Sequence, residues 1–291
     1  MTEGIVTVLK PPAMSSSDVV VDVRHIFDTK RVGHLGTLDP EAAGVLPVCV
    51  GRAVRLFDYL VDKRKTYLCE IAFGAATDTQ DAQGAVTETG DAVVSEAALD
   101  AVLPRFTGTI VQTPPMYSAL KHNGQKLYDL ALQGKEIPDK SREVEIFSLK
   151  RTKTLGENRF LLEVCCSRGT YIRTLCSDVG TALGVPAHMA FLLRTASGMF
   201  TLEHAVSIAE LETMKAEGRL SETLTSCEEA VSFLPRLDFK SDRRRPAVNG
   251  LPTHTNAENG VYRIYCGEFL GIGAVKDGNA VLKVHLYGEE V

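Results

Sequence analysis

The chain has 291 residues, of which 44% are hydrophobic and 24% charged, and its formal net charge is −5. This composition is typical of a globular protein that is large enough for two domains. No apolar run approaches the roughly 18 residues that a membrane helix needs, and the first residues lack the pattern of a signal peptide, so we expect a cytoplasmic protein without a membrane span.

Charge is distributed unevenly along the chain. Residues 201–231 hold seven glutamates against Lys215 and Arg219, whereas residues 101–153 hold nine lysines and arginines against five acidic residues. A negative net charge argues against a generic polyanion binder, but salt-dependent binding to phosphates needs only a local basic face. The charge pattern therefore leaves room for a nucleic-acid-binding surface.

Hydrophobic periodicity predicts mixed strands and helices in the first 235 residues. Ser15 and the two serines after it can cap a helix that runs to residue 27, and alternation along residues 66–73 places Tyr67, Cys69 and Ile71 on one face of a strand. Further strands are expected at 5–9, 46–50, 144–153 and 159–166, and further helices at 52–61, 95–103 and 170–183. Because a strict strand-helix-strand rhythm is missing, an α+β fold is expected rather than a doubly wound one.

The composition changes after about residue 233. A polar, basic stretch is followed by short alternating runs that glycines and an Asp-Gly pair interrupt. This pattern predicts a small β domain at residues 236–291, beside a larger domain at residues 1–235. On these residues alone, an RNA-binding module and a β extension that stabilises the core are equally good interpretations.

The seven cysteines predict neither a disulfide framework nor a zinc site. Their number is odd, no Cys-x-x-Cys pair occurs, and most lie in apolar stretches, which is typical of reduced thiols in a core. No histidines stand at the spacing of metal ligands on a helix, so we expect no metal.

The most informative segment is GHLGTLDPEAAGVL at residues 33–46. It places Asp39 between Leu38 and Pro40, and a carboxylate in such a setting is costly unless it is paired or functional. Pro40 disfavours helical dihedrals at Asp39, and the glycines permit tight turns. The simpler interpretation is an aspartate that caps the turn begun by the residues after it.

This segment resembles the catalytic motif of the TruB family of tRNA pseudouridine synthases. Four further stretches extend the resemblance: KTYLCEIAFGAATDTQDAQG at 65–84, QTPPMYSALKHNGQKLYDLALQGKEI at 112–137, CSRGTYIRTLCSDVGTALG at 166–184 and AHMAFLLRTASGMF at 187–200. FLGIG at 269–273 resembles the signature of the family's PUA-like RNA-binding domain. The chain departs from the family at Ala13, where glycine is usual; the departure concerns the backbone of that loop rather than the chemistry.

The resemblance implies three catalytic residues in a mixed-sheet core. Asp39 is the essential carboxylate, either as a nucleophile or as a base at the ribose C2′. Tyr67 stacks on the base and assists loss of the C5 proton, and Arg173 pairs with Asp39 and keeps it ionised. Spacing alone favours a core position for Tyr67 and a surface position for Arg173.

The resemblance also implies residues that bind the substrate. His34 fills the space that flipped nucleotides leave, Leu192 walls the base pocket, and Tyr171 stands beside Arg173. An RNA-gripping insertion at about residues 112–140 contributes Lys121 and Lys126, where basic side chains are interleaved with tyrosines. A solvated helix face is the simpler interpretation of this basic stretch.

The implied reaction converts uridine to pseudouridine in the T loop of tRNA, at position 55 in tRNA numbering. The base is flipped out, its glycosidic bond is broken, and it is rejoined through C5. Nothing is oxidised or hydrolysed, so no cofactor is expected. The implied partner is tRNA, held by its T arm and acceptor stem through shape and phosphate contacts, and a monomer is expected.

The sequence leaves three alternatives to this interpretation. A guide-RNA-dependent relative would carry extra flanking regions for partner proteins, and no guide RNA is expected here. An RNA-folding chaperone could share the fold, although the motif residues Asp39, Tyr67 and Arg173 are all present. A carboxylate-pair hydrolase would use Asp39 with Asp78 or Asp81, residues that otherwise read as turn or capping groups.

Overall fold

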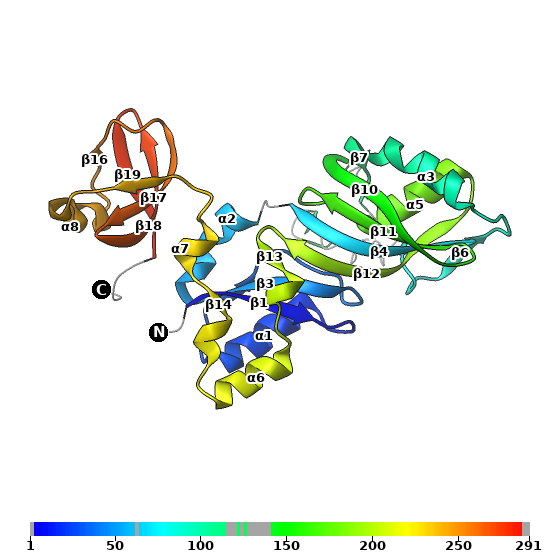
Figure 1. Cartoon of the computed structure of the whole chain (residues 1–291), viewed down its shortest axis with the longest axis horizontal. Helices are drawn as coiled ribbons and strands as arrows, with labels where there is room; N and C mark the ends of the chain where they lie inside the picture. The colour runs from blue at the N-terminus through cyan, green and yellow to red at the C-terminus, as the bar shows by residue number, and fades with distance from the viewer. Residues whose placement is uncertain (1–2, 62–63, 115–120, 123–124, 127–140, 287–291) are drawn as a thin grey trace.

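The computed structural model describes residues 3–61, 64–114, 121–122, 125–126 and 141–286. Two main sheets organise them: a large mixed sheet, and a five-stranded sheet near the C-terminal end that lies to one side in Figure 1. The predicted α+β architecture with a mixed sheet is confirmed.

The large sheet contains β1 (Gly4–Lys10), β2 (Val32–His34), β3 (Ala43–Val50), β4 (Lys65–Phe73), β7 (Gly108–Gln112), β10 (Arg142–Gly156), β11 (Arg159–Cys166), β12 (Ala187–Ser197), β13 (Phe200–Thr201) and β14 (Leu224–Thr225). Its order is β14-β1-β3-β12-β4-β11-β10-β7, with β2 paired to β3 and β13 to β12. The neighbours run antiparallel except β3 and β12, which run parallel. Two short hairpins stand apart: β5 (Ala75–Thr77) with β6 (Val86–Thr89), and β8 (Lys121–His122) with β9 (Gln125–Lys126).

The helices cluster at the two ends of this sheet (Figure 1). Near β1 lie α1 (Ser16–Ile26), α6 (Ile208–Ala216) and α7 (Cys227–Ala230), whereas α3 (Glu96–Val102) and α5 (Ile172–Leu183) pack together near the β4–β10 end. Short 3₁₀ segments are η2 (Leu103–Phe106), η3 (Leu202–His204) and η4 (Leu220–Thr223). The predicted cap of the first helix is confirmed: Ser15 and Asp18 form a reciprocal capping box.

One predicted helix has a different form. Residues 52–61 were expected to be a single helix, but they form the 3₁₀ segment η1 (Gly51–Leu56) followed by one α-helical turn, α2 (Phe57–Leu60). The buried residues of η1 explain this, because Ala53 and Leu56 are three apart, and a 3₁₀ helix places such residues on one face.

The turn that precedes α1 adopts an unusual backbone. Ala13 has a φ of 62°, which lies in the left-handed region that glycine occupies without strain. This is the position where the sequence departs from the glycine of the family pattern. The chain therefore keeps the glycine-type conformation with an alanine.

The five-stranded sheet consists of β15 (Arg236–Asp238), β16 (Thr253–His254), β17 (Gly260–Cys266), β18 (Glu268–Lys276) and β19 (Asn279–His285), with η5 (Ser241–Arg243) and α8 (Arg244–Val248) beside it. Its own core includes Phe239 and Ile264. A second apolar cluster joins it to the rest of the protein, where Ile272 and Leu286 pack with Leu56 and Leu60. The two sheets are thus connected through buried apolar contacts.

Candidate active site

The loop that carries Asp39 (residues 35–42) connects β2 to β3 and is anchored along its length. The Ser16 hydroxyl donates to the carbonyl of Leu38 (3.0 Å) and accepts from its amide (2.9 Å). Lys10, whose side chain is buried, donates from Nζ to the carbonyl of Pro40 at 2.8 Å. These contacts fix both neighbours of Asp39.

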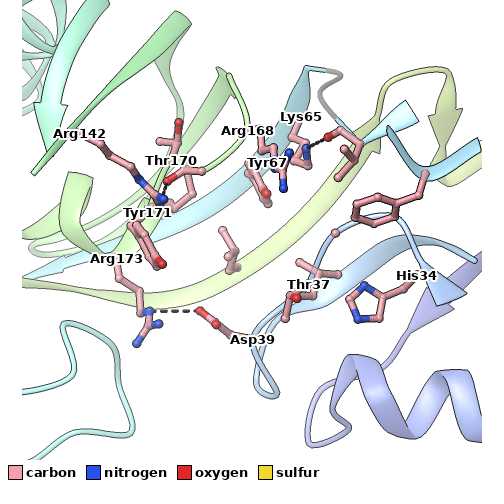
Figure 2. Close-up of a pocket in the computed structure, with 17 residues that line it drawn as sticks. His34, Thr37, Asp39, Lys65, Tyr67, Arg142, Arg168, Thr170, Tyr171 and Arg173 are labelled. Carbon is pink, nitrogen blue, oxygen red and sulfur yellow. Dashed lines mark hydrogen bonds and ion pairs between the residues drawn. The ribbon is translucent and has the colours of Figure 1, made fainter. Parts of the chain in front are cut away.

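A pocket of about 380 Å³ opens beside this loop (Figure 2). It is lined by His34, Gly36, Thr37, Leu38, Asp39, Phe57, Val61, Lys65, Tyr67, Arg142, Arg168, Gly169, Thr170, Tyr171, Ile172, Arg173 and Leu192. The structure thus brings together six residues that the sequence singled out, from four separate stretches of the chain: Asp39, Tyr67, Arg173, His34, Tyr171 and Leu192.

Asp39 faces a guanidinium that two carboxylates share. Arg173 Nε lies 3.1 Å from Asp39 Oδ2, and Arg173 Nη1 lies 3.2 Å from Asp81 Oδ2 (Figure 2 shows the first contact). The Arg173 side chain is 8% exposed and that of Asp39 is 43% exposed, so Asp39 is open to a ligand while its partner is not. Arg173 can therefore orient Asp39 from the buried side of the site, while Asp39 stays accessible.

Tyr67 and Leu192 form an apolar wall of the pocket. They lie on the adjacent strands β4 and β12, and both are buried. Burial raises the pKa of Tyr67, against a smaller opposing effect of Arg194. The Tyr67 hydroxyl is therefore protonated at neutral pH, which suits stacking and hydrogen bonding better than the role of a strong base.

Tyr171 is held in place from two sides. Its amide donates to Gln112 Oε1 at 3.0 Å, and its carbonyl accepts from Gln112 Nε2 at 3.2 Å. The Arg142 guanidinium lies 4.9 Å from the centre of the Tyr171 ring and donates to the carbonyl of Gly169. The loop before α5 is therefore rigidly attached to β7 and β10 at the pocket.

His34 lines the pocket from the end of β2, on the other side of Asp39 from Arg173 (Figure 2). Burial, with a further contribution from Arg194, lowers the pKa of His34 below its usual range. Its imidazole is therefore neutral at physiological pH, and Nδ1 is buried without a hydrogen-bond partner among the described residues.

Several residues at the site were not identified from the sequence. Asp81 was read as a turn group, yet it also pairs with Arg173, 92 positions away. Arg194 is fully buried behind the Asp39 loop, and Lys10 binds Pro40 within it. For Lys10 and Arg194, only their position in apolar strands could have indicated them, because an ionised group there needs partners; Asp81 lies in a polar turn that gives no such signal. Lys65, Arg142 and Arg168 on the pocket wall were missed as well.

Two predicted features fall outside what the structure describes. The side chains of Lys121 and Lys126 are not described, although their backbone forms β8 and β9, and most of the expected insertion lies outside the described residues.

Among the described residues, no group of His, Cys, Asp or Glu side chains is arranged to hold a metal ion, and no helix is long and apolar enough to span a membrane.

The fold resembles that of chains in two solved complexes. A structure described as an H/ACA RNP bound to a substrate RNA containing 2′-deoxyuridine matches with a TM-score of 0.74 and 22% identity, covering 98% of this chain and 85% of that chain. A Cbf5-Nop10-Gar1 complex matches with a TM-score of 0.72 and 25% identity, over 97% and 80% of the two chains.

Sequence comparison gives the family directly. The TruB family pseudouridylate synthase N-terminal domain matches residues 24–172, and the tRNA pseudouridylate synthase B C-terminal domain matches residues 173–232. The tRNA pseudouridine synthase B of Bacillus pumilus is 45% identical over 86% of this chain and 83% of its own length. That of Caldanaerobacter subterraneus is 39% identical over 98% of this chain and 99% of its own. The chain therefore belongs to the TruB family of pseudouridine synthases.

Proposed function

We propose that this protein isomerises uridine to pseudouridine in the T loop of tRNA, at position 55 in tRNA numbering. The observation that carries the proposal is the pocket in which Asp39, Tyr67, Arg173 and Leu192 converge. The proposal is also supported by relatives: curated proteins named tRNA pseudouridine synthase B match this chain at 39–45% identity.

The geometry supports a division of labour among these side chains. A uridine flipped into the pocket would stack against Tyr67 and contact Leu192, and Asp39 would act on its ribose-base unit. Arg173 would orient Asp39 through the contact between Arg173 Nε and Asp39 Oδ2 at 3.1 Å. The energy of flipping, a few kcal/mol, would be offset by these stacking and edge contacts.

Substrate recognition is proposed to depend on RNA shape and phosphate contacts without a guide RNA. His34 would occupy the space vacated by the flipped nucleotides, with Tyr171 beside the base. The residues 236–291, as a PUA-like domain, and the insertion at 112–140 with Lys121 and Lys126 would hold the acceptor stem and T arm. We propose that the protein works as a monomer in the cytoplasm, where tRNA is available.

The carboxylate-pair hydrolase is not favoured by the geometry. Asp81 forms an ion pair with Arg173, and its Oδ1 accepts hydrogen bonds from the hydroxyl of Thr79 at 2.6 Å and from the amide of Gln83 at 3.1 Å. Asp78 accepts from the amide of Ala85 at 2.9 Å. Both carboxylates therefore hold a turn, whereas a general acid or base needs an oxygen that is free for the substrate.

The proposal is tested by tritium release from tRNA labelled at uracil C5. We expect release by the wild type, none by Asp39→Asn, and none from a tRNA whose T-loop uridine is replaced by cytidine. Asp28→Asn serves as the matched control, because Asp28 is exposed and pairs with Lys215 outside the pocket. A folded wild type that binds tRNA without releasing tritium would contradict the enzyme and favour the chaperone interpretation.

A further inference from the structure

Arg194 is the largest fully buried side chain among the described residues, with an exposed fraction of 0%. It lies on β12, next to the parallel strand β3. Burial of a guanidinium is unfavourable unless its N–H groups and its charge are compensated. Among the described residues Arg194 makes no ion pair with a carboxylate, so backbone carbonyls provide the compensation.

Its three carbonyl partners lie on both sides of Asp39 in the chain. Arg194 Nη2 donates to Gly36 at 3.1 Å, and Nη1 donates to Thr37 at 3.3 Å. Nε donates to Val45 at 2.7 Å, on the strand to which the Asp39 loop returns. A single planar side chain therefore ties the start of the loop to the strand that follows it.

The backbone of β3 is shaped to admit this arginine. Gly44 stands opposite Arg194 in the parallel pair and has a φ of 114°. A Cβ at Gly44 would lie 2.2 Å from the carbonyl oxygen of Arg194, a distance that no side chain can accept. Gly44 thus allows β12 to approach β3 closely, and this approach places Arg194 beneath the Asp39 loop.

The same guanidinium also acts on Tyr67. Arg194 stands opposite Tyr67 in the antiparallel pair of β4 and β12, and its charge lowers the pKa of Tyr67 against the larger effect of burial. Asp39 and Tyr67 belong to segments that are far apart in the sequence. Arg194 donates hydrogen bonds to the loop that carries the first, and it stands opposite the second in the pair of β4 and β12.

We propose that Arg194 is a positioning residue, which holds the Asp39 loop at a fixed place relative to Tyr67. It does not touch the substrate, because it is buried behind the pocket wall and does not line the cavity. The proposal rests on the proposed function for its kinetic test. A misplacement of about 1 Å can lower a rate by about 100-fold, so such a residue affects turnover more than binding.

The test compares Arg194→Lys with the wild type in single-turnover pseudouridine formation and in tRNA binding. Lysine keeps the charge, but one ammonium cannot bridge carbonyls on both the loop and β3 as a planar fork does. We expect a rate at least about tenfold lower, with a dissociation constant for tRNA within about twofold of the wild type. Arg151→Lys is the matched control, because Arg151 bridges Asp100 and Glu96 outside the pocket.

Two further measurements separate positioning from general stability. In the double variant with Tyr67→Phe, the rate losses should combine less than additively, because both changes disturb one arrangement. Hydrogen exchange should become faster in residues 36–45 and stay unchanged in β17, which belongs to the other sheet, a readout that needs no activity.

The outcomes are distinct. A folded Arg194→Lys with an unchanged rate and unchanged exchange overturns the proposal, and so does a rate loss that weaker tRNA binding explains completely. A wild type that binds tRNA but forms no pseudouridine overturns the proposed function instead, and the exchange of residues 36–45 then decides the role of Arg194.

Discussion

At the scale of single residues, the site depends on a guanidinium shared by two carboxylates. Arg173 contacts Asp39 and Asp81 with different nitrogens, and it also donates to the carbonyl of Thr79. Asp81 therefore helps to fix the direction in which Arg173 presents itself to Asp39. The substrate can reach Asp39, whereas Arg173 stays largely buried.

We predict that Asp81→Asn lowers turnover by about tenfold. Arg173 would lose a charged hydrogen-bond partner, and its guanidinium would be less firmly oriented toward Asp39. Binding of tRNA should change little, since Asp81 does not line the pocket. Steady-state kinetics on tRNA transcripts would measure both quantities. Asp78→Asn is the control, as Asp78 holds the same turn without contacting Arg173, and an equal loss in both variants would contradict the prediction.

Asp178 on α5 gives a prediction about pH. Burial raises the pKa of Asp178 from 3.8 to about 6, so the folded protein binds this proton more tightly than the unfolded chain does. Ionised Asp178 therefore destabilises the fold increasingly as the pH rises from about 4 to 6. Asp178→Asn should raise the free energy of unfolding by about 1–3 kcal/mol at pH 8 and by nothing below pH 4.

Urea denaturation at pH 8 and pH 3.5 would measure this difference. An increase in stability that is equal at both pH values would show that the charge of Asp178 is not its cause.

At the scale of elements, the turn before α1 carries a local strain. A left-handed conformation costs an L-residue about 1–2 kcal/mol, and Ala13 adopts it. Lys10 donates to Pro11, Met14 and Pro40, so this turn is attached to the Asp39 loop. The strain is thus held next to the active site by a buried lysine.

We predict that Ala13→Gly raises the free energy of unfolding by about 0.5–1 kcal/mol, because relief of strain exceeds the extra entropy that glycine gives the unfolded chain. Ala98→Gly is the control of opposite sign: Ala98 is exposed within α3, and glycine there should cost about 1 kcal/mol. Thermal unfolding of both variants would measure the two effects, and a destabilised Ala13→Gly would be contrary to expectation.

The elements also show how far sequence reasoning reaches. The strands predicted at 66–73 and 159–166 and the cap at Ser15 follow from local patterns, and the structure contains them. The contacts of Arg194 with Gly36 and of Arg173 with Asp81 join residues 158 and 92 positions apart. No local period encodes such pairs, and the family pattern drew attention to Arg173 but not to Arg194 or Asp81.

At the scale of the whole molecule, the C-terminal sheet has its own core and shares a second apolar cluster with the rest of the protein. Ile272 is 0% exposed and packs in the cluster that contains Leu56 and Leu60. Arg55 adds a hydrogen bond from Nη1 to the carbonyl of His285 at 2.9 Å. Removal of the C-terminal sheet would therefore expose apolar surface on the rest of the protein.

We predict that Ile272→Ala lowers the free energy of unfolding by about 2–4 kcal/mol, the usual effect of a cavity in a packed core. Val261→Ala, at a position on β17 that is 38% exposed, should change it by less than about 0.5 kcal/mol. Denaturant unfolding monitored by circular dichroism would compare the variants. Equal effects at the two positions would show that the shared cluster contributes little.

The short helix α2 has a consequence for how the two parts of the protein communicate. Leu56 and Leu60 face the cluster that contains Ile272, whereas Phe57 and Val61, each one residue further along, line the pocket. One helical turn is thus touched by the C-terminal sheet on one side and by any occupant of the pocket on the other. Thermodynamic coupling between two sites is reciprocal. If packing of the C-terminal sheet against α2 strengthens RNA binding, bound RNA therefore strengthens that packing by the same free energy.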